Sequence, residues 1–555
     1  MSVNNNAKIG WFRSGTPWVW MSAGAVSISL VMVFGLLILI AARGLGYFWP
    51  SDVIAMDYIE RDGTEIRVMG EQRETAFVPL ERLLEAGFKL EGHQGDVARH
   101  LLKIGNRDLY GIDFRSVIEP GITSRTIPDR VIVIERHEWG NFYGFLDEVK
   151  EAGKVVAVRD ATHAALTPRL ERTQRLHDEI KHIEKIEIGA INYQLERLRL
   201  KQRKLELNNE FDAQHEQAIA AERAEEEKRY QVLQKKLMDL YEQMNRDSLS
   251  VVSIEGRQVE VNLAKVVRVF YPNEMGNGDK LQHYFMKVWE FLSDEPREAN
   301  TEGGIFPAIF GTVLMVILMA ILVTPFGVVA AIYLREYAKQ GLVTRVIRIA
   351  VNNLAGVPSV VYGVFGLGFF VYFLGGNIDA LFFPEAGPAP TFGTPGILWS
   401  SLTLAILTLP VVIVATEEGL SRIPLAIREG SLALGATKAE TLWRIVIPMA
   451  SPALMTGLIL AVARAAGEVA PLMLVGVVKL APSMPLDGNF PFLHLDRKFM
   501  HLGFHIYDVG FQSPNVEAAR PLVYATALLL VLVIIILNLA AIYIRNRLRA
   551  KYQSI

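Results

Sequence analysis

Two side chains that can do chemistry, Arg464 and Glu468, lie inside an otherwise apolar run from about residue 451 to residue 478. A charge at the middle of a bilayer costs about 3 kcal/mol or more, so such residues normally face the protein interior or a polar pathway. A spacing of four places both on one face of a helix, near the middle of the run. Arginine is a permanently charged fork of donors that suits an anion. The pair therefore predicts a membrane helix with one face that is accessible to water.

Six apolar runs reach the length of about 20 residues that a helix needs to cross the hydrocarbon layer. They cover approximately residues 19–42, 306–334, 346–374, 397–416, 451–478 and 522–544. The first is too long for the core of a signal peptide, so we expect an uncleaved anchor. Lysine and arginine gather after the second, fourth and sixth runs, which places these segments and both termini in the cytoplasm. The sequence predicts an α-helical membrane protein with six transmembrane helices.

Residues 51–300 separate the first two runs and are expected to form a soluble α+β insertion outside the cytoplasmic membrane. Alternating residues around Asp62-Gly63, and again at 130–135 and 250–271, predict strands. A charged helix is expected from Thr167, with Pro168 at its first position, toward Met244. Its apolar steps of three and four weaken near Asn208, which predicts a projecting coiled-coil hairpin over about residues 167–247, with one unbroken helix as the alternative. Its charges indicate either a solvated face or a docking surface.

The predicted organisation is thus 1–50 for the N-terminus and first transmembrane helix, 51–300 for the insertion and 301–555 for the transmembrane domain. The net charge of −2 gives no indication of nucleic-acid binding, and the absence of cysteine excludes disulfides and thiolate metal sites. The sequence contains no Gly-x-x-x-x-Gly-Lys-Ser/Thr loop and no zinc-hydrolase histidine motif. His494, His501 and His505 are interpreted as loop packing. We expect neither an enzyme nor a metal site.

The segment 417–448, between the fourth and fifth runs, contains Glu429, Gly435, Ile445 and Pro448 at a spacing typical of two short helices. Gly435 is expected to end the first helix in the left-handed conformation, Thr437 to cap the second helix and Pro448 to stop it. The spacing resembles the EAA loop of ABC importer permeases, which has a glutamate, two small residues, a glycine at the seventh place and a later Ile-x-Leu-Pro. Here Gly430-Ser431 replaces the two alanines, and Ile447 replaces the leucine.

Residues 300–304, 352–363 and 464–472 together resemble the PstA family of phosphate ABC transporter permeases. The resemblance implies the type I ABC importer permease fold in a bacterial inner membrane, with the insertion in the periplasm. It also implies the partners of that family: a companion permease PstC, a PstB ATPase dimer and the periplasmic phosphate-binding protein PstS. ATP and magnesium would be bound by the ATPase, so no cofactor is expected in this chain, and beyond these proteins only membrane lipid is an expected partner.

The same resemblance implies which residues act. Phosphate binding is expected at Arg464 and Glu468, with Asn352, Asn353 and Ser359 lining the pathway. ATPase coupling is expected at Glu429, Gly435, Ile445 and Pro448. A purely structural ion pair of Arg464 with Glu468 is the alternative for the first pair, and interhelical hydrogen bonding for the other polar residues. The alternatives for the whole chain are a permease for molybdate or sulfate, and a membrane sensor or scaffold that uses the coiled coil.

Overall fold

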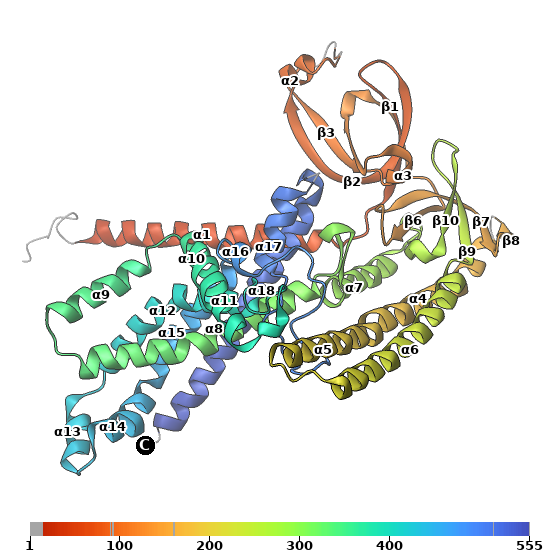
Figure 1. Ribbon diagram of the computed structural model, residues 1–555. Coiled ribbons are helices and arrows are strands. Elements are labelled where there is room, and N and C mark those ends of the chain that lie inside the picture. The colour runs from red at the N-terminus through yellow and green to blue at the C-terminus, as the bar shows by residue number, and fades with distance from the viewer. Residues whose placement is uncertain (1–14, 89, 91–93, 159–160, 514–515, 554–555) are drawn as a thin grey trace, which may run out of the picture.

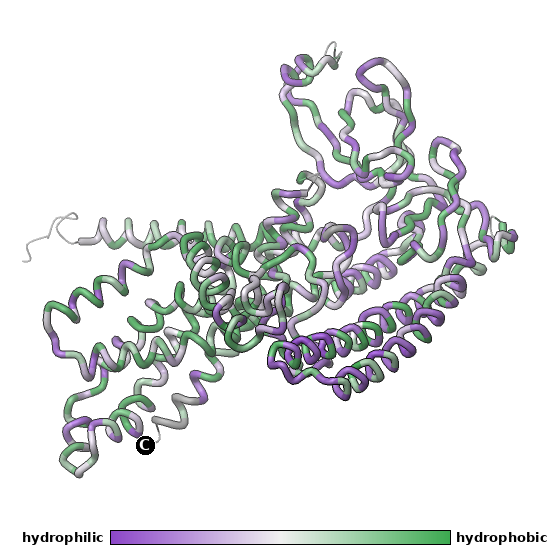
Figure 2. The backbone as a smooth tube through the Cα atoms, in the orientation of Figure 1, coloured by the Kyte–Doolittle hydropathy of each residue, from purple (hydrophilic) through white to green (hydrophobic). Residues whose placement is uncertain are grey.

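The computed structural model describes residues 15–88, 90, 94–158, 161–513 and 516–553. Figure 1 shows a bundle of helices that is joined at one end to two small β-sheets and a pair of long helices. Figure 2 shows the same division by composition, since the bundle is largely hydrophobic and the long paired helices are largely hydrophilic. The chain therefore separates into a membrane part and an α+β insertion, as its composition predicts.

Six helices of the described residues are long and apolar enough to cross a membrane, which confirms the predicted number. They are Thr16–Gly46, Phe306–Tyr337, Ser359–Phe382, Ile397–Ser421, Lys438–Gly467 and Ala519–Arg547. The corresponding elements are α1 (Thr16–Gly46), α8 (Phe306–Ile332), α10 (Ser359–Phe365) with α11 (Gly376–Phe382), α12 (Ile397–Ser421), α14 (Lys438–Thr441) with α15 (Ile447–Gly467), and α18 (Val516–Gln553). Shorter helices are α9 (Leu342–Leu354), α13 (Leu425–Ala433), α16 (Leu472–Val475) and α17 (Leu502–Tyr507).

Two of the predicted spans have the wrong bounds. The third span begins at Ser359 instead of residue 346, because α9 is a separate helix that ends at Leu354 ahead of Gly356 and Pro358. A proline disfavours the helical conformation of the residue before it, so the chain breaks there. The fifth span covers residues 438–467 instead of 451–478. Both shifts arise because apolar composition continues across a break in the backbone.

Helix α12 forms the centre of the bundle, between α8 and α15. Two thirds of its most apolar window is buried, whereas no residue in the corresponding window of α1 is buried. Glycines let α12 and α15 approach closely: a Cβ on Gly457 would lie 2.6 Å from the Cβ of Ala415, and one on Gly419 would lie 2.4 Å from that of Ala453. Small residues at such crossings are the usual means of packing helices in lipid. The bundle is thus a rigid frame for the segments that follow α15.

The first sheet of the insertion is antiparallel, with the strand order β4-β3-β2-β1-β5. Its strands are β1 (Val53–Ile59), β2 (Glu65–Pro79), β3 (Asp96–Lys103), β4 (Phe114–Ile118) and β5 (Ile122–Thr126), with the short helices α2 (Leu80–Glu85) and α3 (Arg107–Tyr110) between them. The predicted hairpin around Asp62-Gly63 is confirmed, since β1 pairs with β2 and Gly63 has a φ of 88°. Positive φ is what glycine supplies in such turns.

The second sheet has the order β10-β9-β7-β6-β11, and β8 pairs with β7. Its strands are β6 (Val131–Arg136), β7 (Phe142–Glu151), β8 (Lys154–Val158), β9 (Asp247–Val252), β10 (Gln258–Asn262) and β11 (Val266–Phe270). These bounds confirm the strands predicted at 130–135 and 250–271. Helix α7 (Asn277–Ser293) and the small hairpin of β12 (Pro296–Arg297) and β13 (Glu302–Gly303) then lead the chain back to α8.

Between β8 and β9 the chain forms two long helical segments. The first is α4 (Thr162–His182), a π-helical turn (Ile183–Glu187) and α5 (Ile188–Leu207), and the second is α6 (Ala213–Met244). A break at residues 208–212, with Asp212 capping α6, confirms two helices over one unbroken helix. Whether they pair as a coiled coil stays a prediction. The predicted start at Pro168 is wrong, because helix α4 already begins at Thr162, where Leu166 packs against the second sheet.

The helical hairpin α4–α6 does not project freely from the insertion. Its distal half returns toward the loops of the membrane part (Figure 1). The Tyr193 hydroxyl donates to the Phe490 carbonyl, and Lys204 Nζ lies 3.7 Å from Glu385 Oε1. The expectation of a projecting arm is therefore corrected, because polar groups on α5 find partners on the bundle.

Candidate functional site

Arg464 lies in the last turn of α15, which ends at Gly467. Glu468 is already extended, with φ −81° and ψ 134°, and the next helix, α16, starts only at Leu472. Pro471 cannot donate a backbone hydrogen bond and disfavours a helical residue before it, which explains the break. The predicted placement of both charges on one continuous helix, near the middle of the span, is thus wrong. They lie instead where a helix stops and backbone groups become available.

The two charges remain close despite the break. Arg464 Nε lies 3.6 Å from Glu468 Oε1, and the side chains are 39% and 20% exposed in this chain. At that separation they attract each other without a direct hydrogen bond. No hydrogen bond of the Arg464 side chain is found within the described residues. The guanidinium therefore has N–H donors available for a ligand. In a purely structural ion pair these donors would already be used in hydrogen bonds.

Helix α10 of the third span packs against this break. A Cβ on Gly363 would lie 2.7 Å from the Cα of Pro471, so only glycine allows this approach. Tyr362, one residue earlier, is an electrostatic neighbour of Arg464, and its hydroxyl donates to the Leu354 carbonyl at 2.5 Å. Tyr362 is not among the site residues predicted from the sequence. The contact joins segments about 100 residues apart, and no local pattern reports such a contact.

The other predicted polar residues lie on α9 and at the first residue of the third span, away from Arg464 and Glu468. Asn352 and Asn353 are exposed in the last turn of α9, and Ser359 begins α10. Asn352 lines a small hollow together with Arg348 and Glu417, whose Nε and Oε1 are 3.3 Å apart. Within the described residues, no hydrogen bond or ion pair joins these polar residues to Arg464 or Glu468. The structure therefore does not bring Asn352, Asn353 or Ser359 together with Arg464 and Glu468 in one cluster.

The segment between α12 and α15 forms a compact corner around Gly435. Gly435 has a φ of 89°, and its N–H donates to the Leu432 carbonyl at 3.0 Å. Thr437 then begins the next helix with a reciprocal capping pair to Glu440. These are the predicted caps. The predicted stop at Pro448 is wrong, because a π-helical turn over Leu442–Val446 carries the helix past the proline, which cannot donate a backbone bond.

The same corner, residues 425–448, is fixed to the bundle at its base and exposed at its tip; we call it the coupling knob. Arg428 Nη1 lies 2.6 Å from Glu336 Oε1, and Arg428 also donates to the Leu420 carbonyl at 2.6 Å. Leu434, at the corner, is 91% exposed, and Glu429 is exposed beside it. Ile445 is half-buried. Leu425, Leu432 and Trp443 of the same segment are exposed as well.

Comparison with known proteins agrees with this geometry. Residues 323–550 match the model of the family described as binding-protein-dependent transport system inner membrane component. The phosphate transport system permease protein PstA 1 of Mycobacterium tuberculosis (strain ATCC 25618 / H37Rv) is 36% identical over 247 residues, which cover 44% of this chain and 70% of that protein. The phosphate transport system permease protein PstA of Yersinia pestis is 30% identical over 256 residues, or 46% of this chain and 77% of that protein.

Other relatives are matched over a smaller share of their length. The probable ABC transporter permease protein YqgH of Bacillus subtilis (strain 168) is 33% identical over 202 residues, and the chain spans 62% of it. Among solved structures, an inward-facing MetNI methionine ABC transporter is 17% identical, with a TM-score of 0.33 over 43% of this chain and 94% of that chain. A TM-score this low does not establish a shared fold. The assignment of the chain to a family therefore depends on the sequence matches.

Proposed function

Because the chain belongs to the family of binding-protein-dependent ABC importer permeases that includes the PstA proteins, we propose that it is the permease subunit of an ATP-driven importer of inorganic phosphate. The observation that carries the proposal is the guanidinium of Arg464. It is partly exposed, has no hydrogen-bond partner within the described residues, and lies where α15 breaks inside the region that matches the family. Broken helices that expose backbone groups are where membrane transporters bind ions.

In this proposal Arg464 contacts the phosphate, and Glu468 holds the guanidinium in place. The carboxylate of Glu468 also favours a phosphate that still carries a proton, since it can accept that proton in a hydrogen bond. Asn352, Asn353 and Ser359 line the path beyond, and Asn352 lies toward the end marked by the ion pair of Arg348 with Glu417.

Transport proceeds by alternating access between this chain and a companion permease of the PstC type. Two PstB-type ATPases bind ATP and magnesium and push on the coupling knob, in which Glu429, Gly435, Ile445 and Pro448 set the shape. A PstS-type binding protein delivers phosphate on the other face. The coupling knob and both ends of the chain then lie in the cytoplasm of a bacterium, and the insertion, with its coiled-coil arm, lies in the periplasm.

Uptake of radiolabelled phosphate in cells that lack other phosphate systems tests the proposal. We expect Arg464→Gln to abolish uptake, because the amide is a neutral and weaker partner for the anion, while the subunits still copurify. Arg464→Lys keeps the charge but loses the planar fork, so partial uptake is expected. Normal uptake by Arg464→Gln would discard the site. If sulfate or molybdate, at the same concentration as phosphate, inhibited phosphate uptake, that anion would be the substrate instead. If the chain purified without an ATPase, a sensor or scaffold would be favoured.

A further inference from the structure

A cavity of about 500 Å³ lies where the insertion meets the membrane part. We call it the junction cavity. Five parts of the chain that are distant in sequence form its walls: the residues after α1, the first sheet with the segment around α3, the second sheet through Glu135 and Phe270, the segment from α7 to β13, and the start of α18. It is separate from Arg464, which does not line it. Neither the proposed transport path nor the coupling knob makes use of it.

One wall of the junction cavity is apolar and belongs to the ends of the spans. Phe48 packs on Phe291 with ring centroids 5.2 Å apart, and the ring centroids of Trp49 and Tyr284 are 6.1 Å apart. Ala519 and Leu522, at the start of α18, complete this wall. Aromatic residues just beyond a transmembrane helix mark the boundary between lipid and water. The cavity therefore opens at the level where phospholipid headgroups lie.

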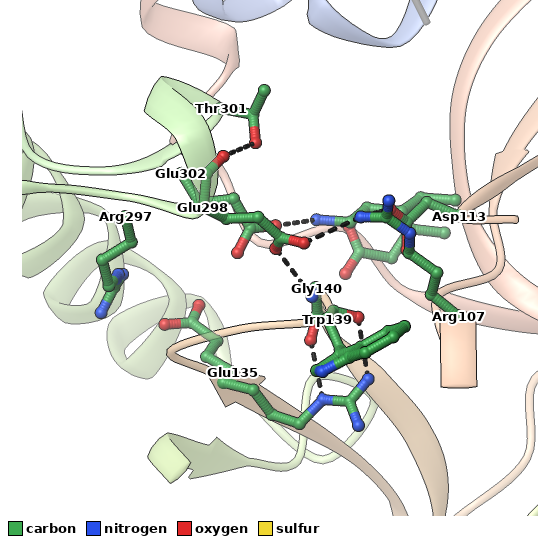
Figure 3. Close-up of polar contacts among 12 residues, drawn as sticks. Arg107, Asp113, Glu135, Trp139, Gly140, Arg297, Glu298, Thr301 and Glu302 are labelled. Atoms are coloured by element: carbon green, nitrogen blue, oxygen red, sulfur yellow. Dashed lines mark hydrogen bonds and ion pairs between the residues drawn. The ribbon is translucent and has the colours of Figure 1, made fainter. Parts of the chain in front are cut away.

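The opposite wall carries both signs of charge, as Figure 3 shows. Lys103 Nζ lies 3.0 Å from Glu302 Oε1, and Arg107 Nη1 lies 2.9 Å from Glu298 Oε1. The charged residues of this wall are Glu71, Arg73, Lys103, Arg107, Asp113, Glu135, Lys287, Glu290, Arg297, Glu298 and Glu302. Five are basic and six are acidic in that set, so the wall is almost neutral overall. A ligand with one charge of each sign matches it better than a simple anion or cation.

Two atoms of the charged wall have unmet hydrogen-bonding capacity. Asp113 Oδ1 and Arg297 Nε are buried without a hydrogen-bond partner in the part of the chain that the structure describes. A buried polar atom without a hydrogen bond lowers the stability of the folded protein by about 1–3 kcal/mol, so such atoms normally have a partner. Figure 3 shows Arg297 and Asp113 on opposite sides of Glu298. Glu298 already accepts from Arg107 Nη1 at 2.9 Å and from the Gly140 N–H at 2.8 Å. Burial raises the pKa of Asp113, whose Oδ2 lies 4.0 Å from Arg107 Nη1, so a closer cation would stabilise the Asp113 carboxylate.

We propose that the junction cavity binds the headgroup of a zwitterionic aminophospholipid of the outer leaflet. The ammonium lies at Asp113 Oδ1, the phosphate oxygen accepts from Arg297 Nε, and the start of the acyl chains follows Phe48, Phe291 and Leu522. A water-soluble phosphoethanolamine has the same polar chemistry. The apolar wall next to α1 and α18 favours the lipid, because only the lipid fills both walls.

The experiment measures which lipids the full-length chain retains together with its copurifying subunits. The complex is reconstituted in nanodiscs with equal amounts of phosphatidylethanolamine and phosphatidylglycerol, transferred to detergent, and its bound lipids are extracted and quantified by mass spectrometry. We expect the wild type to retain phosphatidylethanolamine in excess over phosphatidylglycerol, because only the former has an ammonium for Asp113.

Two variants act on opposite walls of the cavity. Asp113→Asn removes the charge that meets the ammonium, and Ala519→Phe fills the apolar wall without changing any charge. Each should lower retained phosphatidylethanolamine about tenfold, as expected for one lost charge-assisted bond or a blocked wall. Asp147→Asn is the control, since Asp147 accepts one hydrogen bond from Gln258 at 3.2 Å and does not line the cavity. If Asp113→Asn fails to fold, Ala519→Phe still decides the question.

Three results would overturn the proposal: equal retention of the two lipids by the wild type, wild-type retention of phosphatidylethanolamine by Ala519→Phe, or displacement of the lipid by an equal concentration of soluble phosphoethanolamine. The last would mean that the headgroup alone is the ligand. Loss of retention in Asp147→Asn would show that the measurement reports general destabilisation, and it would likewise count against the site.

Discussion

Gly363 determines how closely the third span approaches the break after Arg464. A Cβ at this position would lie 2.7 Å from the Cα of Pro471, so a side chain forces α10 away. We expect Gly363→Ala to destabilise the protein by about 1–3 kcal/mol through overpacking, and to reduce phosphate uptake. Gly368→Ala is the matched control, because no atom lies within 4 Å of a Cβ there. Thermal unfolding measures the loss of stability, and phosphate uptake measures the loss of transport. Equal results for Gly363→Ala and Gly368→Ala would show that the contact of Gly363 with Pro471 does not matter.

His137 gives the insertion a predicted sensitivity to acid. Its ring stacks on that of His177 with centroids 4.4 Å apart. Burial, and then His177, lower the pKa of His137 to about 4, with further contributions from Arg297 and Lys181. Below the unfolded pKa of about 6.5, the unfolded chain takes up a proton that the folded chain refuses. Stability should therefore fall as the pH falls from about 6.5 toward 4.

Thermal unfolding as a function of pH measures this dependence. His137→Gln removes one titrating group, so the loss of stability between those pH values should become smaller. His182→Gln is a suitable control, since His182 is an exposed residue of α4. A pH dependence of His137→Gln as steep as that of the wild type would contradict the assignment.

At the scale of elements, the shape of the coupling knob depends on a single left-handed residue. Gly435 has a φ of 89°, where a side chain costs about 1–2 kcal/mol. Gly435→Ala should therefore shift the knob and lower uptake more than it lowers protein abundance. Gly430 lies inside α13 with open space around a Cβ, so Gly430→Ala should leave uptake unchanged and strengthen the helix. ATPase activity that no longer responds to the binding protein in Gly435→Ala would show lost coupling, whereas unchanged uptake in that variant would contradict the model.

The elements show which features the sequence could predict. The spans and the strands follow from composition and alternation, and the caps at Gly435 and Thr437 follow from residue type, so these were predictable. Pro168 and Pro448 were misread as helix ends because packing, or a π-helical turn, carries the helix past a proline. The spacing of Arg464 and Glu468 correctly predicted their proximity, but the break between them and the contacts of Tyr362 depend on tertiary structure. The junction cavity joins five distant segments, which no local pattern can reveal.

For the molecule as a whole, the position of the helical hairpin α4–α6 decides what the insertion can reach. Its helix α5 contacts two loops of the membrane part, through Tyr193 with the Phe490 carbonyl and through Lys204 with Glu385. The Glu385 side chain is only 10% exposed, so the ammonium of Lys204 offsets a largely buried charge. An arm held in this way covers these two loops of its own chain, whereas a projecting arm would leave them uncovered.

A zero-length carbodiimide cross-link in membrane vesicles tests this position. The reagent joins an amine to a carboxylate that it already touches, so we expect a peptide that links Lys204 with Glu385, whose Nζ and Oε1 are 3.7 Å apart. Lys204→Arg keeps the charge but provides no amine, and it should remove that product alone. The pair of Lys236 with Glu179, 2.7 Å apart within the arm, is the internal control and should react in both proteins. Because a free arm would give only the internal product, absence of the first link beside a normal second link would refute the docked arrangement.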